Sequence, residues 1–227
     1  MISIFTNTIG REFYLKKNIK AIEKQLRNNV DIEHNIIFSG CTPTNDFVDF
    51  LNSLNVNYRS KIKLETTKDI SSIGKNLNYA ASNASGKLFL KLDDDAEILT
   101  DNFFNHILEI NELKPNSVFS PFPIGLINNL GGVKAISHEV IFSEKMNVYY
   151  TLRKTDHVGG FCRICPTNLI KQIKFTDSHN EDTEFSSFVR SNNLEIFYLE
   201  NSIVVEHMES TLGQHKRYGN SYFKGRF

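Results

Sequence analysis

Three consecutive carboxylates, Asp93, Asp94 and Asp95, follow the apolar run KLFLKL and precede Ile98. Adjacent carboxylates repel one another and are costly to remove from water unless a positive charge lies among them. In an extended segment alternate residues point the same way, so we expect Asp93 and Asp95 to share a side and Asp94 to face away. Two convergent carboxylates suit a hard divalent cation, Mn²⁺ or Mg²⁺, whose other positions take water and phosphate oxygens. A solvated acidic turn is the alternative.

A second acidic pair, Glu181 and Asp182, opens the segment EDTEFSSFVRS, in which Phe185, Phe188 and Val189 recur at helical spacing. Acids are favoured in the first turn of a helix. Asp182 shares the helical face of Phe185 and Val189, so we expect it to lean toward the buried side. A carboxylate placed there can accept a hydroxyl proton as a general base. Capping of the helix start explains the same residues without chemistry.

His207 closes the apolar segment SIVVEH. An isolated histidine can be a hydrogen-bonded structural residue or a metal ligand. The Asp-x-Asp sequence upstream favours the ligand, so His207 joins Asp95 and Asp93 as an expected metal-binding residue.

Three cysteines, Cys41, Cys162 and Cys165, are too few for a disulfide framework. Cys162 and Cys165 form a C-x-x-C pair, but a zinc site needs about two further ligands, and the sequence holds no second pair of this kind. A redox motif would follow an early strand. We therefore expect buried, unpaired thiols.

The elements that carry these residues alternate between strand-like and helix-like patterns in the first hundred residues. Gly40 and Gly86 end two of these elements. Such alternation predicts a mostly parallel sheet covered by helices on both faces, with ligands at the carboxyl ends of its strands. The acidic residues then lie at the mouth of a cleft. The expected strands are 2–6, 33–40, 61–67 and 87–92, and the expected helices are 12–27, 47–54 and 77–84.

The second half of the chain is less regular. We expect a helix over 101–111, strands up to about residue 155, a strand leading into a short helix within GGFCRICPTNLIKQI, a helix over 181–191, and two strands over 195–199 and 202–207. The sequence holds no internal repeat, low-complexity tract or linker. One domain over 1–227 is therefore the simplest interpretation.

Composition narrows the class of protein. The 227 residues carry 26 basic and 26 acidic side chains, so the formal net charge is zero and no general affinity for nucleic acid is expected. Apolar residues make up 40% of the chain, as in globular proteins, and no apolar run is long enough for a membrane span. The start, MISIFTNTIG, does not resemble a signal peptide. A cytoplasmic location is the expectation.

Several motifs occur in the order in which family-two-like glycosyltransferases with the GT-A fold carry them. The stretch IGKNLNYAASNASGKLFLKLDDDAEI resembles the family segment in which a basic residue and Asn open a helix and a strand leads to the Asp-x-Asp metal motif. HVGGFCRICPTNLIKQIKF resembles the acceptor-side Gly-Gly segment, HNEDTEF the Glu-Asp motif, and IVVEH the late His. The resemblance covers nearly the whole chain.

The resemblance implies a fold and a division of the chain. The fold is α/β of GT-A type, with a Rossmann-like, mostly parallel central sheet flanked by helices and a smaller mixed sheet on the acceptor side. Residues 1–100 would bind the nucleotide sugar, 101–210 would bind the acceptor, and 211–227 would form a basic tail. The charge of that tail suggests a flap that covers the diphosphate and makes a peripheral membrane contact, and a solvated or frayed terminus is the alternative. Its charged and aromatic residues are Lys216, Arg217, Lys224, Arg226, Tyr218, Tyr222 and Phe223.

The resemblance also implies site residues and partners. Asp182, with Glu181 as second candidate, is the expected base of an inverting transfer. The cation, Mn²⁺ or Mg²⁺, is expected at Asp95, Asp93 and His207. The donor would be a nucleoside diphosphate sugar, by resemblance a UDP-sugar, and the acceptor a glycan, lipid-linked molecule or protein, as in polysaccharide biosynthesis. The residues expected to bind the nucleotide sugar are Thr6, Asn7, Ser39, Lys75, Asn76, Asp93, Asp94, Gly159 and Gly160.

Two positions depart from the family pattern. The second strand ends in Ser39, Gly40 and Cys41, where the family has acidic residues near the nucleoside. Lys75 stands where the family has Arg, which keeps the charge and loses the bidentate fork.

Two other functions fit part of the pattern. A nucleotidyltransferase would attack the α-phosphate and would need a Gly-rich, basic loop after the first strand, but FTNTIGREF offers only Gly10 and Arg11. A sugar- or protein-binding module with a relict site is the non-enzymatic alternative. Binding of UDP with and without Mn²⁺ discriminates between that module and an enzyme.

Overall fold

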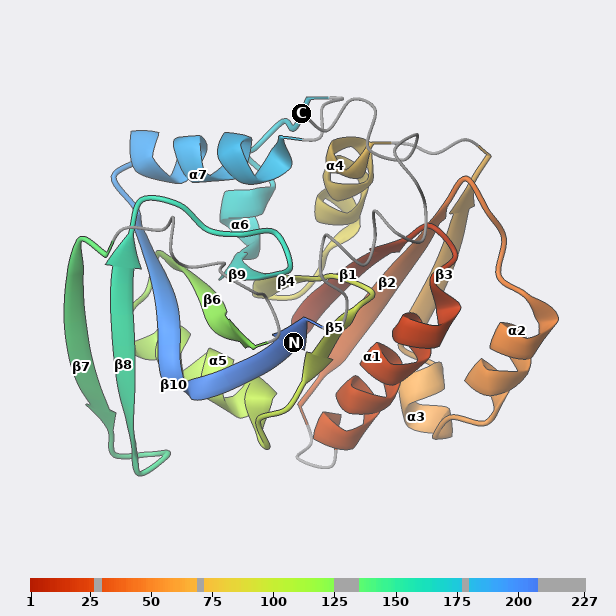
Figure 1. Cartoon of the computed structure of the whole chain (residues 1–227), viewed down its shortest axis with the longest axis horizontal. Coiled ribbons are helices and arrows are strands. Elements are labelled where there is room, and N and C mark those ends of the chain that lie inside the picture. The colour runs from red at the N-terminus through yellow and green to blue at the C-terminus, as the bar shows by residue number, and fades with distance from the viewer. Residues whose placement is uncertain (27–29, 69–71, 125–134, 177–179, 208–227) are drawn as a thin grey trace.

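A ten-stranded sheet organises the chain in the computed structural model, which describes residues 1–26, 30–68, 72–124, 135–176 and 180–207. Figure 1 shows it extending from β7 at the left to β3 at the right. The strand order is β3-β2-β1-β4-β9-β6-β10-β8-β7, and β5 pairs with β10. The strands are β1 Ile2–Thr8, β2 Ile32–Ser39, β3 Ile62–Thr67, β4 Leu88–Leu92, β5 Ala96–Ile98, β6 Ser117–Ile124, β7 Ser137–Ser143, β8 Val148–Thr155, β9 Cys162–Pro166 and β10 Glu195–His207.

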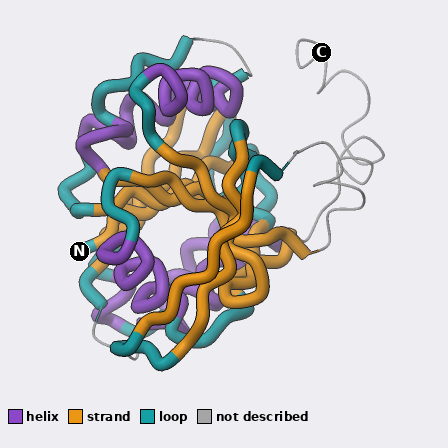
Figure 2. The backbone as a smooth tube through the Cα atoms, turned by 90° about the vertical axis from the view of Figure 1, so that its left-hand side faces the viewer, coloured by secondary structure: helices purple, strands orange, loops and turns teal. Residues whose placement is uncertain are grey.

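Helices cover both faces of this sheet, as the side view also shows (Figure 2). Buried side chains of α1, α2 and α5 pack on one face, and those of α4, α6 and α7 on the other. The helices are α1 Glu12–Gln25, α2 Asn45–Asn52, α3 Val56–Arg59, α4 Ile73–Asn83, α5 Phe103–Leu113, α6 Thr167–Ile170 and α7 Glu181–Ser191. The predicted α/β class, with a sheet between helices, is confirmed.

The first half of the sheet is parallel. Strand β1 pairs in parallel with β2 and β4, and β2 pairs in parallel with β3. The carboxyl ends of these strands therefore meet at one edge, where Thr8, Ser39 and the residues after Leu92 lie. The predicted position of the acidic cluster at a strand end is confirmed.

The second half returns to this sheet through β9, which lies antiparallel between β4 and β6. Strands β6 and β10 pair in parallel, while β8 and β7 continue the sheet in antiparallel orientation. The prediction of two separate final strands is wrong, because β10 runs unbroken from Glu195 to His207. A register shift between Leu199 and Val204 interrupts its ladder with β6. The short α3 and β5 were not expected from the sequence.

Cys162 and Cys165 lie on opposite faces of β9. Cys162 belongs to the core beneath α1 and α5, and Cys165 to the core beneath α4 and α7. Both are buried thiols, and burial raises the pKa of each. The prediction of unpaired cysteines is confirmed, because residues three apart on a strand point in opposite directions.

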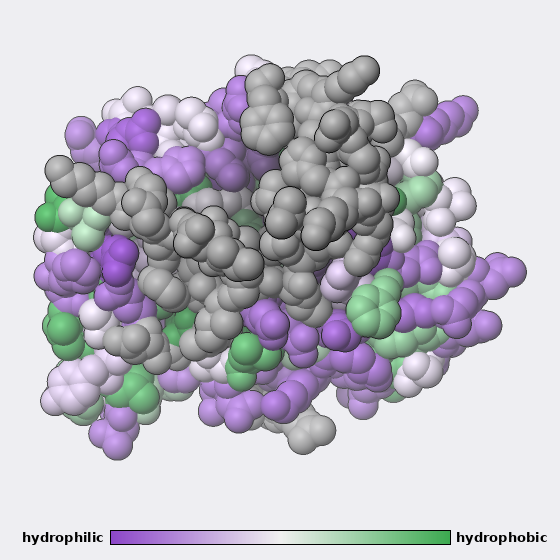
Figure 3. Space-filling view, viewed as in Figure 1, coloured by the Kyte–Doolittle hydropathy of each residue, from purple (hydrophilic) through white to green (hydrophobic). Residues whose placement is uncertain are grey.

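Most of the described surface in Figure 3 is polar, with apolar patches toward the lower left, over the hairpin of β7 and β8. Val140, Phe142 and Tyr149 are exposed on this hairpin. Within the described ranges, no helix has both the length and the apolar character needed to cross a bilayer. The basic tail expected over 211–227 lies outside the described residues.

Candidate active site

The three carboxylates form a tight turn, not an extended segment. Strand β4 ends at Leu92, and the Ala96 amide donates a hydrogen bond of 3.0 Å to the Asp93 carbonyl. The expectation that Asp94 faces away from Asp95 is therefore wrong, because alternation holds only while the backbone stays extended. Asp94 and Asp95 are both fully buried and contact the same cation.

That cation is Arg11, which lies directly before α1. Its Nη1 donates to Asp95 Oδ2 at 2.8 Å, its Nε donates to Asp94 Oδ2 at 3.1 Å, and its Nη2 pairs with Asp94 Oδ1. Thr8, the last residue of β1, donates its hydroxyl to Asp94 Oδ2 at 2.6 Å. The end of β1 and the loop after it are thus bonded to the turn after β4, which lies close because the two strands are parallel neighbours.

Asp94 and Asp95 are buried next to each other, which disfavours their charged forms. Burial raises the pKa of the Asp94 carboxyl to about 7, an effect that Arg11 opposes and the neighbouring Asp95 charge reinforces. Burial alone would lower the pKa of Arg11, but the charges of Asp94 and Asp95 outweigh it and raise that pKa, so the guanidinium stays charged. Arg11 therefore offsets part of the cost of burying Asp94 and Asp95 together.

The side chain of Asn18, in α1, is hydrogen-bonded to the backbone of this turn. It is fully buried, and its Nδ2 donates to the carbonyls of Asp93 at 3.0 Å and Ala96 at 2.9 Å. The Asp93 carbonyl also accepts the Ala96 amide, so Asn18 gives that carbonyl a second donor and gives the Ala96 carbonyl a side-chain donor as well. One amide side chain therefore fixes the turn against the helix.

Asp93 connects the turn to the second half of the chain. Its amide donates to the Phe161 carbonyl at 2.8 Å, continuing the ladder between β4 and β9. Its Oδ1 accepts from Lys91 Nζ at 2.6 Å, and the same ammonium donates to the Gly160 carbonyl. Lys91 is 3% exposed. The acidic turn and the Gly-Gly segment, predicted as donor-side and acceptor-side features, therefore share one buried cation.

Gly160 in turn lies against Asp182. A methyl group built on Gly160 would lie 2.8 Å from Asp182 Oδ2 and 2.9 Å from its Cγ. Asp182 Oδ1 accepts from Arg163 Nη1 at 3.4 Å, while the Asp182 side chain is 34% exposed. Asp182 thus faces this cluster at the start of α7, and it contacts Arg163 instead of capping its own helix.

Glu181 is the more buried of the acidic pair, at 8% exposed. Burial raises the pKa of its carboxyl, while the charge of Lys91 lowers it and that of Asp182 raises it further. A buried carboxylate of this kind is less available to a substrate than its partly exposed neighbour Asp182.

The predicted metal residues are of types that bind divalent cations, but in this structure both carboxylates are ion-paired, Asp95 with Arg11 and Asp93 with Lys91. Asp93 and Asp95 offer carboxylate oxygens, and the backbone of His207 pairs with that of Ala96, the residue after Asp95. Oxygen donors with one imidazole fit Mn²⁺ or Mg²⁺. The described residues hold no ready group of three or more His, Cys, Asp and Glu side chains. Within the described residues, the nearby Asp94 and Asp95 are paired with Arg11.

The other residues predicted to bind the nucleotide sugar differ in their burial and in their hydrogen-bond partners. Asn76 Nδ2 donates to Asn7 Oδ1 at 2.7 Å, so these two side chains meet at the strand ends, and Gly159 N donates to Tyr198 OH at 2.9 Å. Thr6 is fully buried, with its hydroxyl 3.0 Å from His34 Nε2, and Ser39 is buried too. Lys75 is exposed on α4. Their roles stay predictions.

Sequence reasoning missed Arg11, Lys91 and Arg163 as site residues. The signal for two of them was present, because Lys91 interrupts the apolar run KLFLKL and Arg163 the run FCRIC. A lone cation inside a buried strand needs an acidic partner. Arg11 carried no comparable signal.

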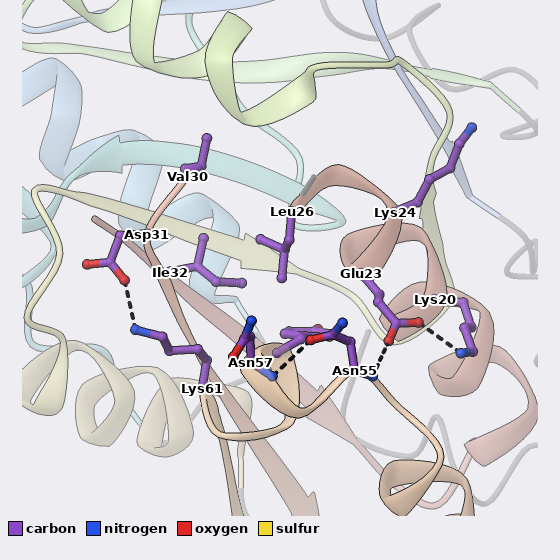
Figure 4. A pocket seen from close by; sticks show the side chains of 11 residues that line it. Lys20, Glu23, Lys24, Leu26, Val30, Asp31, Ile32, Asn55, Asn57 and Lys61 are labelled. Atoms are coloured by element: carbon purple, nitrogen blue, oxygen red, sulfur yellow. Dashed lines mark hydrogen bonds and ion pairs between the residues drawn. The ribbon is translucent and has the colours of Figure 1, made fainter. Parts of the chain in front are cut away.

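A separate pocket of about 680 Å³ lies at the amino end of β2, away from this edge. Leu26, Val30, Ile32 and Tyr58 supply its apolar wall. Four of its charged residues pair with one another, Lys20 with Glu23 and Lys61 with Asp31 (Figure 4), while Lys24 pairs with Asp101 outside the pocket.

Solved glycosyltransferase structures share this architecture. S. aureus TarS 1-349 in complex with UDP-GlcNAc matches with a TM-score of 0.65 and 18% identity over 92% of this chain. Mannosyltransferase PcManGT from Pyrobaculum calidifontis, in complex with GDP-Man and Mn²⁺, matches with a TM-score of 0.67 and 11% identity over 95%. GalNAc-T7 with UDP, GalNAc and Mn²⁺ gives 0.66 and 10% over 94%.

The chain has the GT-A glycosyltransferase fold. The fold implied by the sequence motifs is thereby confirmed. This GT-A domain spans 58% of the TarS 1-349 chain, 59% of PcManGT and 44% of GalNAc-T7. Comparisons with protein-family models and with curated proteins find no match.

Proposed function

We propose that this chain is a metal-dependent glycosyltransferase that moves a sugar from a nucleoside diphosphate sugar to an acceptor hydroxyl. One observation carries the proposal. Lys91 and Gly160 join the acidic turn after β4 to Asp182 at the start of α7. This supports the proposal, because the carboxylates proposed to bind the cation and the proposed base lie at one edge of a sheet whose fold glycosyltransferases share.

Asp182 is the proposed base. Sugar transfer by displacement requires a group that takes the proton of the acceptor hydroxyl as its oxygen attacks. Asp182 is more exposed than Glu181, and Gly160 leaves room beside its carboxylate. Attack from the side opposite the departing diphosphate inverts the anomeric carbon, so an α-linked donor gives a β-linked product.

Asp95, Asp93 and His207 are the residues that would hold the cation. When bound, Mn²⁺ or Mg²⁺ would stabilise the negative charge of the leaving diphosphate. Asn18 and Arg11 hold the turn that presents these carboxylates. Two similar structures, GalNAc-T7 and PcManGT, were solved with Mn²⁺, which supports the choice of metal.

The nucleotide is proposed to be UDP. TarS and GalNAc-T7 were solved with UDP-GlcNAc and with UDP, and PcManGT with GDP-Man. Asn7 and Asn76 meet at the strand ends and are proposed to contact the donor together with Lys75. The acceptor is proposed to be a glycan, a lipid-linked molecule or a protein, and the site of action the cytoplasm.

Two measurements test the proposal. Calorimetry should detect UDP binding that requires Mn²⁺ and is abolished in Asp95→Ala. A panel of nucleotide sugars should reveal a donor that is turned over, and Asp182→Asn should lower kcat by roughly two to four orders of magnitude with donor affinity unchanged.

Each alternative has its own outcome. UDP binding without turnover of any donor would favour a binding module, and pyrophosphate release from a nucleoside triphosphate would favour a nucleotidyltransferase. Retained anomeric configuration in the product, read from NMR couplings, would refute inversion. A fully active Asp182→Asn would move attention to Glu181.

A further inference from the structure

Two cations face each other in the middle of the sheet. Lys91 on β4 and Arg163 on β9 are direct antiparallel partners, so their side chains leave the same face. Lys91 is 3% exposed and Arg163 is 1% exposed. Like charges directly opposite each other on neighbouring strands are destabilising, and buried cations are costly. An apolar pair would suit a structural role better, so the arrangement needs another explanation.

Lys91 and Arg163 are hydrogen-bonded to different carboxylates. Lys91 donates to Asp93 Oδ1 and to the Gly160 carbonyl, toward the acidic turn. Arg163 donates through Nη1 to Asp182 Oδ1, toward α7. Arg163 is therefore the described cation whose hydrogen bond goes to the proposed base.

Arg163 is held rigidly in this position. Its guanidinium carbon lies 4.0 Å from the centroid of the Phe185 ring, and Phe185 is one turn of α7 beyond Asp182. A guanidinium over an aromatic face is attracted to it and loses rotational freedom. Its Nη2 is buried without a hydrogen-bond partner among the described residues. Stacking, more than a full set of hydrogen bonds, fixes the side chain.

The Asp182 carboxylate lies against the backbone of Gly160 and against the Arg163 guanidinium. Gly160 approaches this carboxylate closely enough that a methyl group there would clash, and Arg163 holds Oδ1 from another side. The 3.4 Å separation is long for a charge-assisted hydrogen bond, whose usual length is about 2.7–2.9 Å. The contact therefore orients the carboxylate while leaving its oxygens available to a substrate proton. Lys91, Glu181 and Tyr198 are the other titratable groups around it.

We propose that Arg163 is a positioning residue that aims the Asp182 carboxylate at the acceptor hydroxyl. The proposal rests on the proposed function, since it assumes that Asp182 is the base. Arg163 is 1% exposed, so it would act through Asp182 and not by contact with donor or acceptor. Its removal should then lower the rate of transfer without changing how the donor binds.

The test compares Arg163→Met, Arg163→Lys, Asp182→Asn and the double variant Arg163→Met/Asp182→Asn. Arg163→Met should lower kcat roughly 100-fold, as expected for a base misplaced by about 1 Å, with donor KM and Mn²⁺-dependent UDP affinity unchanged. Arg163→Lys, which keeps a charge in reach, should recover part of the loss. Arg190, an exposed arginine of α7, the helix that carries Asp182, provides the control, and Arg190→Met should keep full activity.

The double variant separates positioning from structure. If Arg163 works through Asp182, adding Arg163→Met to Asp182→Asn should cause no further loss of kcat. Losses that multiply, or a normal kcat in a folded Arg163→Met protein, would overturn the proposal and leave the proposed function standing. A fully active Asp182→Asn would overturn the base and the positioning role together.

A crystal structure of the variant gives a readout that does not depend on activity. In Arg163→Met the Asp182 side chain should adopt more than one conformation, and in Arg163→Lys a single one. An Asp182 carboxylate that stays in place in Arg163→Met would overturn the proposal. If Arg163→Met does not fold, Arg163→Lys and Arg163→Gln give the same comparison. Failure of the wild-type chain to turn over any donor would refute the proposed function itself.

Discussion

Arg11→Met is the most informative perturbation of the acidic turn after β4. The substitution keeps the aliphatic stem of the side chain and removes the guanidinium that pairs with Asp94 and Asp95, both fully buried. Removing one partner of a buried ion pair leaves uncompensated charge and costs about 3–5 kcal/mol. We expect a loss of unfolding free energy of this size, because the Arg11 side chain is itself only 11% exposed.

Mn²⁺ should repair part of this loss if the same carboxylates bind it. A ligand that binds only the folded state at about 100 times its Kd adds about 2.7 kcal/mol. In the wild-type protein the cation must compete with Arg11 for Asp95, whereas in Arg11→Met it does not. Mn²⁺ should therefore bind the variant more tightly and stabilise it more at equal concentration.

Urea unfolding with and without Mn²⁺ measures both effects, and titration calorimetry gives the Mn²⁺ affinity directly. Lys16→Met is the control, because Lys16 pairs with the exposed Asp46 and its loss should cost under about 1 kcal/mol. Two results would refute the reasoning: an Arg11→Met protein as stable as wild type, or equal stabilisation of both proteins by Mn²⁺.

Two further substitutions test the interior. Gly160→Ala should lower kcat and leave Mn²⁺-dependent UDP binding unchanged, because its methyl group displaces the Asp182 carboxylate. Gly159→Ala, whose methyl group meets Tyr198 OH at 3.5 Å, should lower kcat less. Equal losses of kcat would contradict this. Burial lowers the pKa of His34 from its ordinary 6.5 to about 3. The contribution of the neutral imidazole to folding stability is therefore fully present above pH 6.5, and it is lost as the pH falls toward 3. At about pH 4.5 the loss from this residue should reach about 2.7 kcal/mol, and His34→Gln, which does not titrate, should show a flatter pH dependence of unfolding. An unchanged pH dependence in His34→Gln would contradict the assignment.

The sequence was informative where a local pattern determines the structure. The change from KLFLKL to DDD marks the end of β4, and the spacing of Phe185 and Val189 places α7, because both depend on neighbours along the chain. The side-chain partners could not be predicted in the same way. Arg11 meets Asp94 across 83 residues, and that contact depends on a turn where alternation fails.

The order of the strands in the sheet also could not be predicted from the sequence. Lys91 and Arg163 become neighbours only because β9 runs antiparallel between β4 and β6, and no periodicity in the sequence specifies that pairing. The length of β10 was misread for a related reason. Polar residues between Leu199 and Ile203 suggested a break, but the strand continues through a register shift against β6.

The insertion of β9 beside β4 has a consequence for how the protein can be divided. The two strands pair residues 70 to 78 positions apart, from Leu92 with Cys162 to Leu88 with Pro166. Contacts of such separation form late in folding, so the edge that holds Asp93 and Gly160 is completed only when the second half has docked. A fragment of residues 1–100 would leave the apolar β4 as a bare edge strand, which invites pairing with other chains. Residues 1–100 should therefore aggregate when expressed alone.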